Sequence, residues 1–208
     1  MKQISMAVAT YNDMHGSLPP PFIADANGKP MHSWRVLLLP FLEQKQLYNK
    51  YDFSEPWNGP NNRKLASQIP HVYRCPCEPQ TGTTTSYVVV TGNGTAFPTN
   101  GQLKYSDIGD GSAFTILIVE IANSDINWME PRDLTFDQMD FEINSPGNMG
   151  ISSGHKGGAT VALADGSTSF LSNETPSSTI RSLLTANGRE AAGHTTPHAP
   201  QSSLRESP

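Results

Sequence analysis

An Asp-Gly pair between two apolar runs is the feature that most restricts how this chain can fold. Residues 158–164 (GATVALA) and 167–172 (STSFLS) flank Asp165 and Gly166. This arrangement is the strongest short-range signal for a β-hairpin, because a type I′ turn needs two residues with positive φ. The sequence therefore predicts two antiparallel strands joined by a tight turn at Asp165-Gly166.

Further strands are predicted upstream of this hairpin. Residues 86–91 (SYVVVT) are β-branched and aromatic, and residues 113–121 (AFTILIVEI) are the most apolar run in the chain. We expect the second run to be a central strand that is buried on both faces. Residues 71–74 predict a shorter strand. Residues 123–154 are rich in Asn, Asp and Pro and predict a long loop, with a short helix at 134–139 as an alternative.

The first residues of the chain predict an amphipathic helix. Its apolar side chains recur at helical spacing, Gly16 is a plausible C-cap, and the prolines at 19–21 block continuation. The helical pattern has no N-cap signal and begins at Met1, so we expect a truncated helix. The apolar positions are Ile4, Ala7, Val8, Tyr11 and Met14.

Other helical segments follow. Residues 33–51 predict a helical region that Pro40 interrupts, and residues 58–68 predict a short helix. A last helix is predicted with Thr175 as its N-cap, Pro176 at its first position and Gly188 as its C-cap. Its apolar face comprises Ile180, Leu183 and Leu184.

These elements predict one α+β head domain over residues 1–190, in which an N-terminal helix packs on an antiparallel sheet. Long loops and a C-terminal helix complete the domain. Residues 191–208 are polar and rich in proline, and we predict that they are disordered. The 17 glycines and 17 prolines agree with a fold of many turns.

The charge pattern excludes two classes of partner. The formal net charge is -5, and no segment clusters Lys and Arg, so the chain lacks the basic patch that nucleic acids or anionic membranes require. No segment reaches the roughly 20 apolar residues of a membrane span, and no signal peptide is visible.

Residues 150–154 match the G-x-S-x-G pattern of hydrolase nucleophiles. That mechanism needs a strand before Ser152 and a helix after it, whereas here a loop precedes and a strand follows. A hydrolase that uses Ser152 or Cys77 with His155 is therefore the least favoured interpretation, and we predict no catalytic residues.

Metal binding is also not expected from the spacing of donor residues. Two cysteines cannot complete a four-ligand zinc site, and the histidines lack ligand spacing. A calcium site is an alternative, but the acidic residues lack the order of an EF-hand, and helix caps or solvated charges are the favoured interpretation. These residues are Asp125, Glu130, Asp133, Asp137 and Asp140.

Cys75 and Cys77 are separated only by Pro76. They are either ordinary thiols or a disulfide that closes a very small ring. Pro76 stiffens the link, and an exported protein would favour the bridge because its compartment is oxidising.

A second candidate site combines aromatic and charged residues in loops. It could bind a solute if a flat apolar side chain and several charges converge there. In the favoured alternative, the tryptophan of the loop packs on the sheet and Arg132 pairs with Asp133 or Glu130. The candidate residues are Trp57, Trp128, Glu130, Arg132 and Asp133.

His155 lies at the entry to the first strand of the hairpin, and Asp165 lies at the end of that strand. A strand length separates them, so they cannot touch within one hairpin. Considered alone, His155 is expected to bond to a backbone carbonyl.

The spacing of His155 and Asp165-Gly166 resembles the H-X9-DG signature of a large bacterial family, the proteins with domain of unknown function 1559. Other blocks are similar to the same family over nearly the whole chain, although Cys75-Pro-Cys77-Glu78 departs from its usual C-P-S-D. The blocks span residues 2–12, 16–20, 33–44, 73–76, 86–88 and 110–112, with Glu120.

The resemblance implies a pilin-like fold and a non-enzymatic subunit of a type II secretion or type IV pilus-like assembly. Residues 1–16 would be the remnant of a long helix that anchors the full-length protein in the inner membrane. Its partners would be other pilin-like subunits or the secretion machinery, and the head would lie in the periplasm or at the cell surface. The family is also described as extracytoplasmic solute-binding proteins, which is the alternative function.

Overall fold

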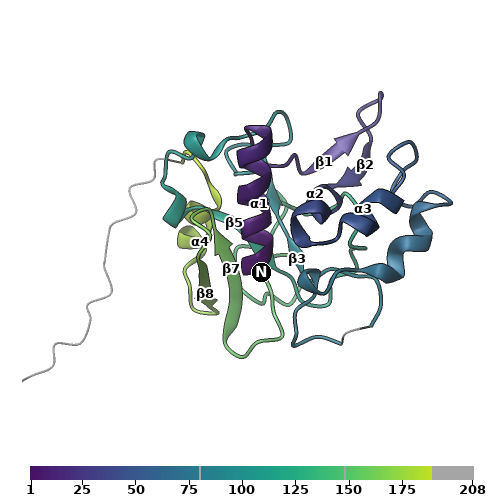
Figure 1. The fold of residues 1–208 in the computed structure, drawn as a ribbon. Coiled ribbons are helices and arrows are strands. Elements are labelled where there is room, and N and C mark those ends of the chain that lie inside the picture. The colour runs from purple at the N-terminus through teal and green to yellow at the C-terminus, as the bar shows by residue number, and fades with distance from the viewer. Residues whose placement is uncertain (80, 148, 189–208) are drawn as a thin grey trace, which may run out of the picture.

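A four-stranded antiparallel sheet forms the centre of the molecule (Figure 1). The computed structural model describes residues 1–79, 81–147 and 149–188, so the predicted disorder of residues 191–208 lies outside the described part. The strand order is β3-β5-β7-β8. The strands are β3 (Tyr87–Val88), β5 (Ile116–Glu120), β7 (Gly158–Leu163) and β8 (Thr168–Ser172).

Strand β5 lies between β3 and β7, and all five of its residues are buried. Its apolar run fits this position, because side chains on both faces of a central strand are covered. Val119 lies opposite Val88 on one side and opposite Val161 on the other, while Glu120 lies opposite Tyr87. The prediction of a buried central strand is confirmed.

The hairpin β7–β8 is also confirmed, but its predicted turn type is wrong. Gly166 has φ 83°, whereas Asp165 does not have a positive φ. The Gly166 N–H donates to the Leu163 carbonyl at 3.0 Å, and the Leu163 N–H donates to the Ser167 carbonyl at 2.9 Å. This pattern is typical of a three-residue loop that ends in a left-handed residue, so only one positive φ is needed.

Helix α1 (Lys2–His15) lies across one face of the sheet and contacts β7 (Figure 1). Its side chains Ile4, Ala7 and Val8 are buried. Gly16 ends the helix with φ 77°, and its N–H donates to the Asn12 carbonyl at 2.7 Å. The predicted helix and its glycine cap are confirmed.

The helical region around Pro40 is broken into short pieces, as predicted. Helix α2 (Trp34–Leu37) is followed by the 3-10 helix η1 (Leu39–Leu42), which contains Pro40, and by α3 (Lys45–Lys50). A two-stranded hairpin of β1 (Phe22–Ala24) and β2 (Pro30–Ser33) precedes them.

Two short segments differ from their predictions. Residues 71–74 contain the 3-10 helix η3 (His71–Tyr73) instead of a strand, because Tyr73 turns into the core and its N–H donates to the Pro70 carbonyl. The alternative helix at 134–139 is β6 (Leu134–Thr135), which pairs in parallel with β4 (Val90–Thr91). In both places tertiary contacts override a weak local pattern.

The remaining helices cover other parts of the molecule. Helix α4 (Ser177–Leu184) begins one residue later than predicted, with Pro176 in place of Thr175 as its N-cap and Thr185 in place of Gly188 as its C-cap. The short 3-10 helices are η2 (Asn62–Gln68), η4 (Tyr105–Asp107) and η5 (Ser112–Phe114).

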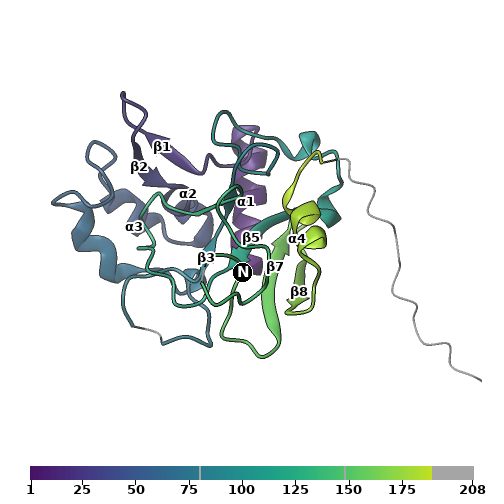
Figure 2. The same ribbon diagram turned by 180° about the vertical axis from the view of Figure 1, so that it is seen from behind.

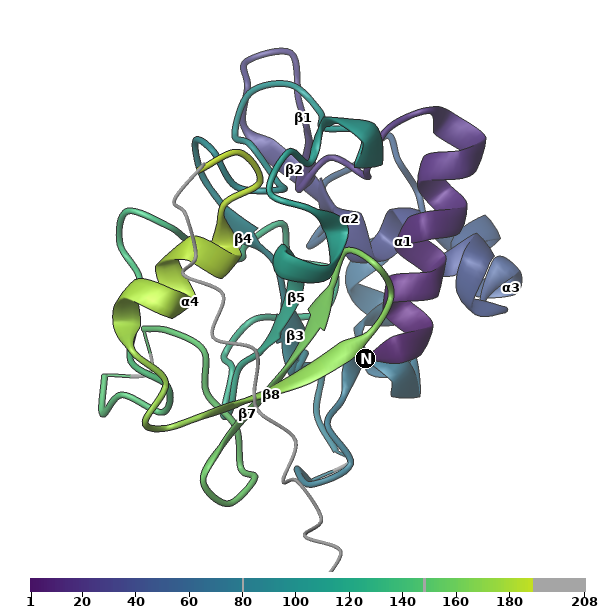
Figure 3. The same cartoon turned by 90° about the vertical axis from the view of Figure 1, so that its left-hand side faces the viewer.

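The sheet separates two apolar cores. One core joins the sheet to α1 and to the helices around Trp34 and Leu38, and the other joins it to Ile180 and Leu184 of α4. Helices α1 and α4 therefore lie on opposite sides of the sheet (Figure 3), and α4 is in front of it when the molecule is seen from behind (Figure 2). Within the described residues, no helix combines the length and the apolar character needed to cross a membrane.

Candidate functional site

Four side chains with sulfur, nitrogen or oxygen donors meet at one end of the sheet. Cys75 and Cys77 follow η3, Glu120 is the last residue of β5, and His155 lies in the loop before β7. One donor atom of each lies within 4.8 Å of the others.

Cys75 and Cys77 are joined by a disulfide, with their Cα atoms 5.3 Å apart. Cys75 is buried, whereas Cys77 is exposed. The Cys75 N–H donates to Ser86 Oγ at 2.8 Å, and that hydroxyl donates to Glu78 Oε2 at 2.7 Å. The bridged alternative considered from the sequence is thus the one that the structure contains.

Glu120 is a carboxylate inside the protein, with 2% of its surface exposed. Its Oε2 accepts a hydrogen bond from the Thr160 N–H at 3.1 Å, and its Oε1 lies 3.5 Å from His155 Nε2. Burial raises the pKa of the neighbouring Tyr87 to about 12, and the charges of Glu120 and Glu78 add to that rise. Glu120 is therefore oriented toward the imidazole from a fixed strand end.

His155 reaches toward both the carboxylate and the sulfurs. Its Nε2 lies 3.4 Å from Cys75 Sγ, and its own backbone N–H donates to Ser153 Oγ at 3.1 Å. The imidazole is 43% exposed, so the cluster opens to solvent on this side. The expected bond from the His155 side chain to a backbone carbonyl is replaced by these side-chain contacts.

The two halves of the H-X9-DG spacing have separate roles. Asp165 lies in the β7–β8 turn, where its Oδ1 accepts a hydrogen bond from the Ser167 N–H at 2.8 Å. Hydrogen bonding from the Ser167 side chain, followed by this backbone bond, lowers the pKa of Asp165. Asp165 and Gly166 therefore shape the hairpin, while His155 belongs to the sulfur and carboxylate cluster.

The cluster was missed by sequence reasoning because its members are far apart in the chain. Eighty residues separate Cys75 from His155. No metal-ligand spacing links them, and the register of β5 and β7 is what brings Glu120 to the same end of the sheet. The third and fourth donors, Glu120 and His155, come from β5 and from the loop before β7.

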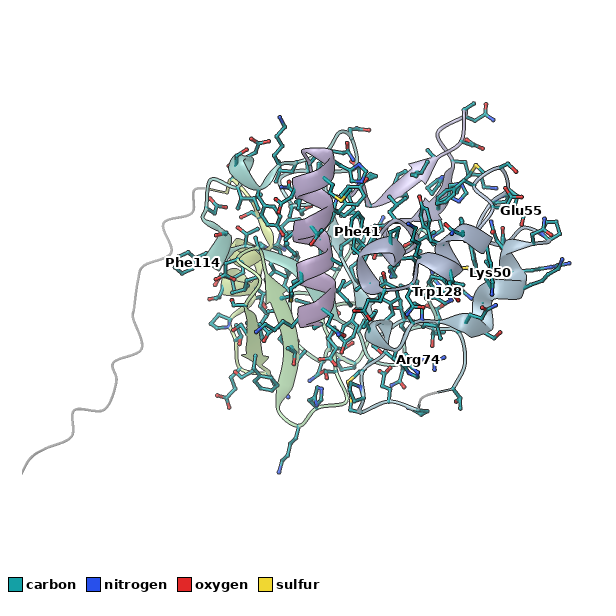
Figure 4. The ribbon with its side chains drawn as sticks, viewed as in Figure 1. Phe41, Lys50, Glu55, Arg74, Phe114 and Trp128 are labelled. Atoms are coloured by element: carbon teal, nitrogen blue, oxygen red, sulfur yellow. A yellow bond between two sulfur atoms is a disulfide. The ribbon has the colours of Figure 1, made fainter. Side chains whose placement is uncertain are left out.

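Trp128 does not provide the exposed aromatic surface considered for a solute site. Its side chain has 0% exposure and lies inside the molecule (Figure 4). Its Nε1–H donates to the Ala66 carbonyl at 3.0 Å, and its ring stacks on Tyr73. Trp57 is half-buried and packs against the same core. Its backbone N–H donates to the Met31 carbonyl.

The charged candidates pair with protein groups. Arg132 Nη1 lies 3.0 Å from Asp125 Oδ1, and Arg132 Nε lies 2.7 Å from Glu130 Oε1. The ion pair with Glu130 is one of the two that the sequence favours over solute binding. Asp133 instead pairs with Arg35. A half-open cavity of about 410 Å³ remains beside Arg132, lined in part by Asp125, Gln138, Met139 and Met149.

Arg35 is a buried residue that sequence reasoning did not single out. Its side chain is fully buried, and its guanidinium donates to five oxygen atoms. The signal was present, since an arginine within an apolar helical run must find partners when it is buried. The acceptors are Ser33 Oγ, the carbonyls of Tyr87, Glu130 and Arg132, and Asp133 Oδ1.

The acidic residues named for the calcium alternative contact other protein groups. Asp125 and Glu130 contact Arg132, Asp133 contacts Arg35, and Asp140 accepts a hydrogen bond from Ser145. In the part of the chain that the structure describes, the acidic residues of this loop form no group of three converging donors. Asp137 is likewise outside the one group of converging donors found among the described residues.

Ser152 is not placed as a nucleophile. It is 3% exposed, and its Oγ accepts a hydrogen bond from the Ala122 N–H at 3.0 Å. The hydroxyl therefore helps to fix the chain after β5.

Comparison with known proteins gives one family. The family model SBP_bac_10, described as "Protein of unknown function (DUF1559)", matches residues 1–131. This range includes Cys75, Cys77 and Glu120, and ends before His155. No curated protein and no solved structure matches the chain.

Proposed function

The chain belongs to the DUF1559 family, and on that premise we propose that it is a pilin-like or pseudopilin-like structural subunit with its head outside the cytoplasm. The proposal includes an anchor in the inner membrane through an N-terminal extension of α1, and assembly with similar subunits or with a secretion apparatus. It assigns no enzymatic activity to the head.

The observation that carries the proposal is the two-sided character of α1. One face of the helix supplies Ile4, Ala7 and Val8 to the core. On the opposite face Met6 is 60% exposed. Met14 is 69% exposed in the last turn, although the apolar spacing predicts it on the buried face. A helix that is held by the sheet on one side and presents a large apolar side chain, Met6, on the other is suited to contact a second subunit.

A groove beside α1 supports the same proposal. It has a volume of about 210 Å³ and opens next to Met6. An amphipathic helix of a neighbouring subunit could place apolar side chains there, as helices do in apolar grooves. The lining residues are Gln3, Met6, Phe41, Leu42, Glu43 and Val72.

The disulfide also agrees with a head outside the cytoplasm. Disulfides persist in oxidising compartments and are rare in reducing ones. The bond between Cys75 and Cys77 therefore supports, without requiring, an extracytoplasmic location.

The test is photo-crosslinking of the complete gene product in its native host. A photoreactive amino acid at Met6 should yield crosslinked species in the membrane fraction. The matched control is Phe114, which is 50% exposed and lies away from Phe41 of the groove (Figure 4). Equal crosslinking from both positions, or recovery of the complete product only as a soluble monomer, would count against the proposal.

Solute binding is the second candidate, and the cavity of about 410 Å³ beside Arg132 is the observation that favours it. Its charged groups already pair with one another, which leaves fewer of them for a ligand. Thermal-shift screening against sugars, amino acids and peptides tests it, because a ligand that binds only the folded state raises Tm. A raised Tm that is lost in Arg132→Ala would support this candidate.

A further inference from the structure

We propose that Cys75, Cys77, Glu120 and His155 bind one zinc ion when the disulfide between the two cysteines is reduced. This site is distinct from the assembly surface on α1 and does not depend on the proposed function. The disulfide and the metal site use the same two sulfurs, so the two states exclude each other.

The spacing of the donor atoms fits a tetrahedral zinc centre. Ligand distances of about 2.3 Å for sulfur and about 2.0–2.2 Å for nitrogen and oxygen give tetrahedral edges of about 3.4–3.6 Å between unlike ligands. The structure has 3.4 Å between Cys75 Sγ and His155 Nε2, and 3.5 Å between His155 Nε2 and Glu120 Oε1. Two edges of the tetrahedron are therefore already formed.

Glu120 gives an independent reason to expect a cation. Its carboxylate is 2% exposed, and a buried carboxylate is costly unless a positive charge or several donors compensate it. Oε2 has the Thr160 N–H, whereas Oε1 is directed at the imidazole edge. A zinc ion between Oε1, the imidazole and the sulfurs would neutralise this charge.

Serine hydroxyls hold the backbone of two ligands, and such outer contacts orient the inner ligands of metal sites. The Cys75 N–H is fixed by Ser86, and the His155 N–H by Ser153. The Cys77 N–H points to Cys75 Sγ at 3.4 Å, a contact that would favour a thiolate. Two thiolates with one imidazole and one carboxylate form a donor set that suits zinc better than calcium or magnesium.

The disulfide form converts to the zinc form in two steps, a thiol–disulfide exchange and then metal binding. A dithiol reductant breaks the Cys75–Cys77 bond, gives two electrons and two protons to the two sulfurs, and leaves as its own disulfide. Zinc then displaces the two thiol protons into solvent. The sulfurs must separate to about 3.8 Å, the tetrahedral edge between two thiolates. Cys77 can make this movement because it is exposed.

The experiment is a metal titration of the full chain in both redox states. Protein reduced with a phosphine, which does not compete as a thiol, should bind about one equivalent of Zn²⁺. Co²⁺ in its place should show the absorption of a tetrahedral site with thiolate ligands. The oxidised protein should bind neither ion tightly. Reduced protein that binds no Zn²⁺ would overturn the proposal.

Variants test which side chains bind the ion. His155→Ala and Cys77→Ser change exposed residues, so the fold should persist, and each should lower the affinity for Zn²⁺ by at least about tenfold. The control is His71→Ala, which removes an exposed histidine outside the cluster and should leave the affinity unchanged. Equal affinity in His155→Ala and the parent would overturn the four-ligand site, because the sulfurs alone would then hold the metal.

Discussion

Arg35 and Asp133 form a buried ion pair in which Nη2 of Arg35 lies 2.7 Å from Oδ1 of Asp133. The same guanidinium donates to the carbonyls of Tyr87 and Arg132, so a single side chain connects α2, the start of β3 and the loop before β6. Asp133 also accepts from the Trp34 indole and the Val89 N–H. Burial raises the pKa of Asp133 to about 6, although Arg35 and these donors oppose the rise.

Replacing Arg35 should therefore be costly. We expect Arg35→Met to lower the free energy of unfolding by about 3–5 kcal/mol, because Asp133 would remain buried without its cation. Urea denaturation at neutral pH measures the loss. Arg132→Met is the matched control, since Arg132 is 45% exposed and its ion pairs contribute under about 1 kcal/mol. Similar losses in both variants would show that the buried pair does not hold these segments together.

The β7–β8 turn should depend on Gly166. Its φ of 83° is strained for residues with a side chain, so Gly166→Val should lower the free energy of unfolding by at least about 1–2 kcal/mol. Gly166→Asn is the control, because asparagine tolerates the left-handed region better. Thermal melting compares the two variants. An unchanged Tm in Gly166→Val would refute the turn, while His155→Ala should leave the fold largely intact.

His32 should make stability depend on pH. It is buried, its Nδ1 lies 3.0 Å from the Tyr51 hydroxyl, and burial lowers its pKa below the ordinary value of 6.5. The unfolded chain then binds the proton more readily than the folded chain. The contribution of neutral His32 to the free energy of unfolding is therefore fully present above pH 6.5. It is lost as the pH falls from 6.5 through the lower pKa of the folded state.

Denaturation between pH 5 and pH 8 measures this effect as the slope of unfolding free energy against pH. His32→Gln should flatten the slope just below pH 6.5. His71→Gln, which removes an exposed histidine, should retain it. If both variants keep the slope of the parent, His32 is not its source.

Reduction and zinc should have opposite effects on stability. Opening the small Cys75–Cys77 ring should lower the free energy of unfolding by about 1–2 kcal/mol, since a short loop restricts the unfolded chain only slightly. Zinc at about 100 times its Kd should then add about 2.7 kcal/mol to the reduced protein. Thermal melts of reduced protein with and without Zn²⁺ measure both steps. No rise in Tm with zinc would contradict the metal site.

Local patterns were sufficient for the main elements. The apolar spacing of α1 with its Gly16 cap, the buried run of β5 and the Asp165-Gly166 hairpin were all predictable, because each depends on residues close together in the chain. Membership of the DUF1559 family was likewise visible in short ungapped blocks. Short segments such as η3 and β6 were not predictable, since a few residues have no reliable period of their own.

The N-terminal helix, the central strand and the hairpin are specified by residues close together in the chain, because periodicity depends on neighbours a few residues apart. The enclosure of Trp128, the pairing of Arg35 with Asp133 and the distance of 3.4 Å between His155 and Cys75 are specified only by the folded molecule. These contacts depend on strand register and on the packing of distant segments, which no local pattern encodes.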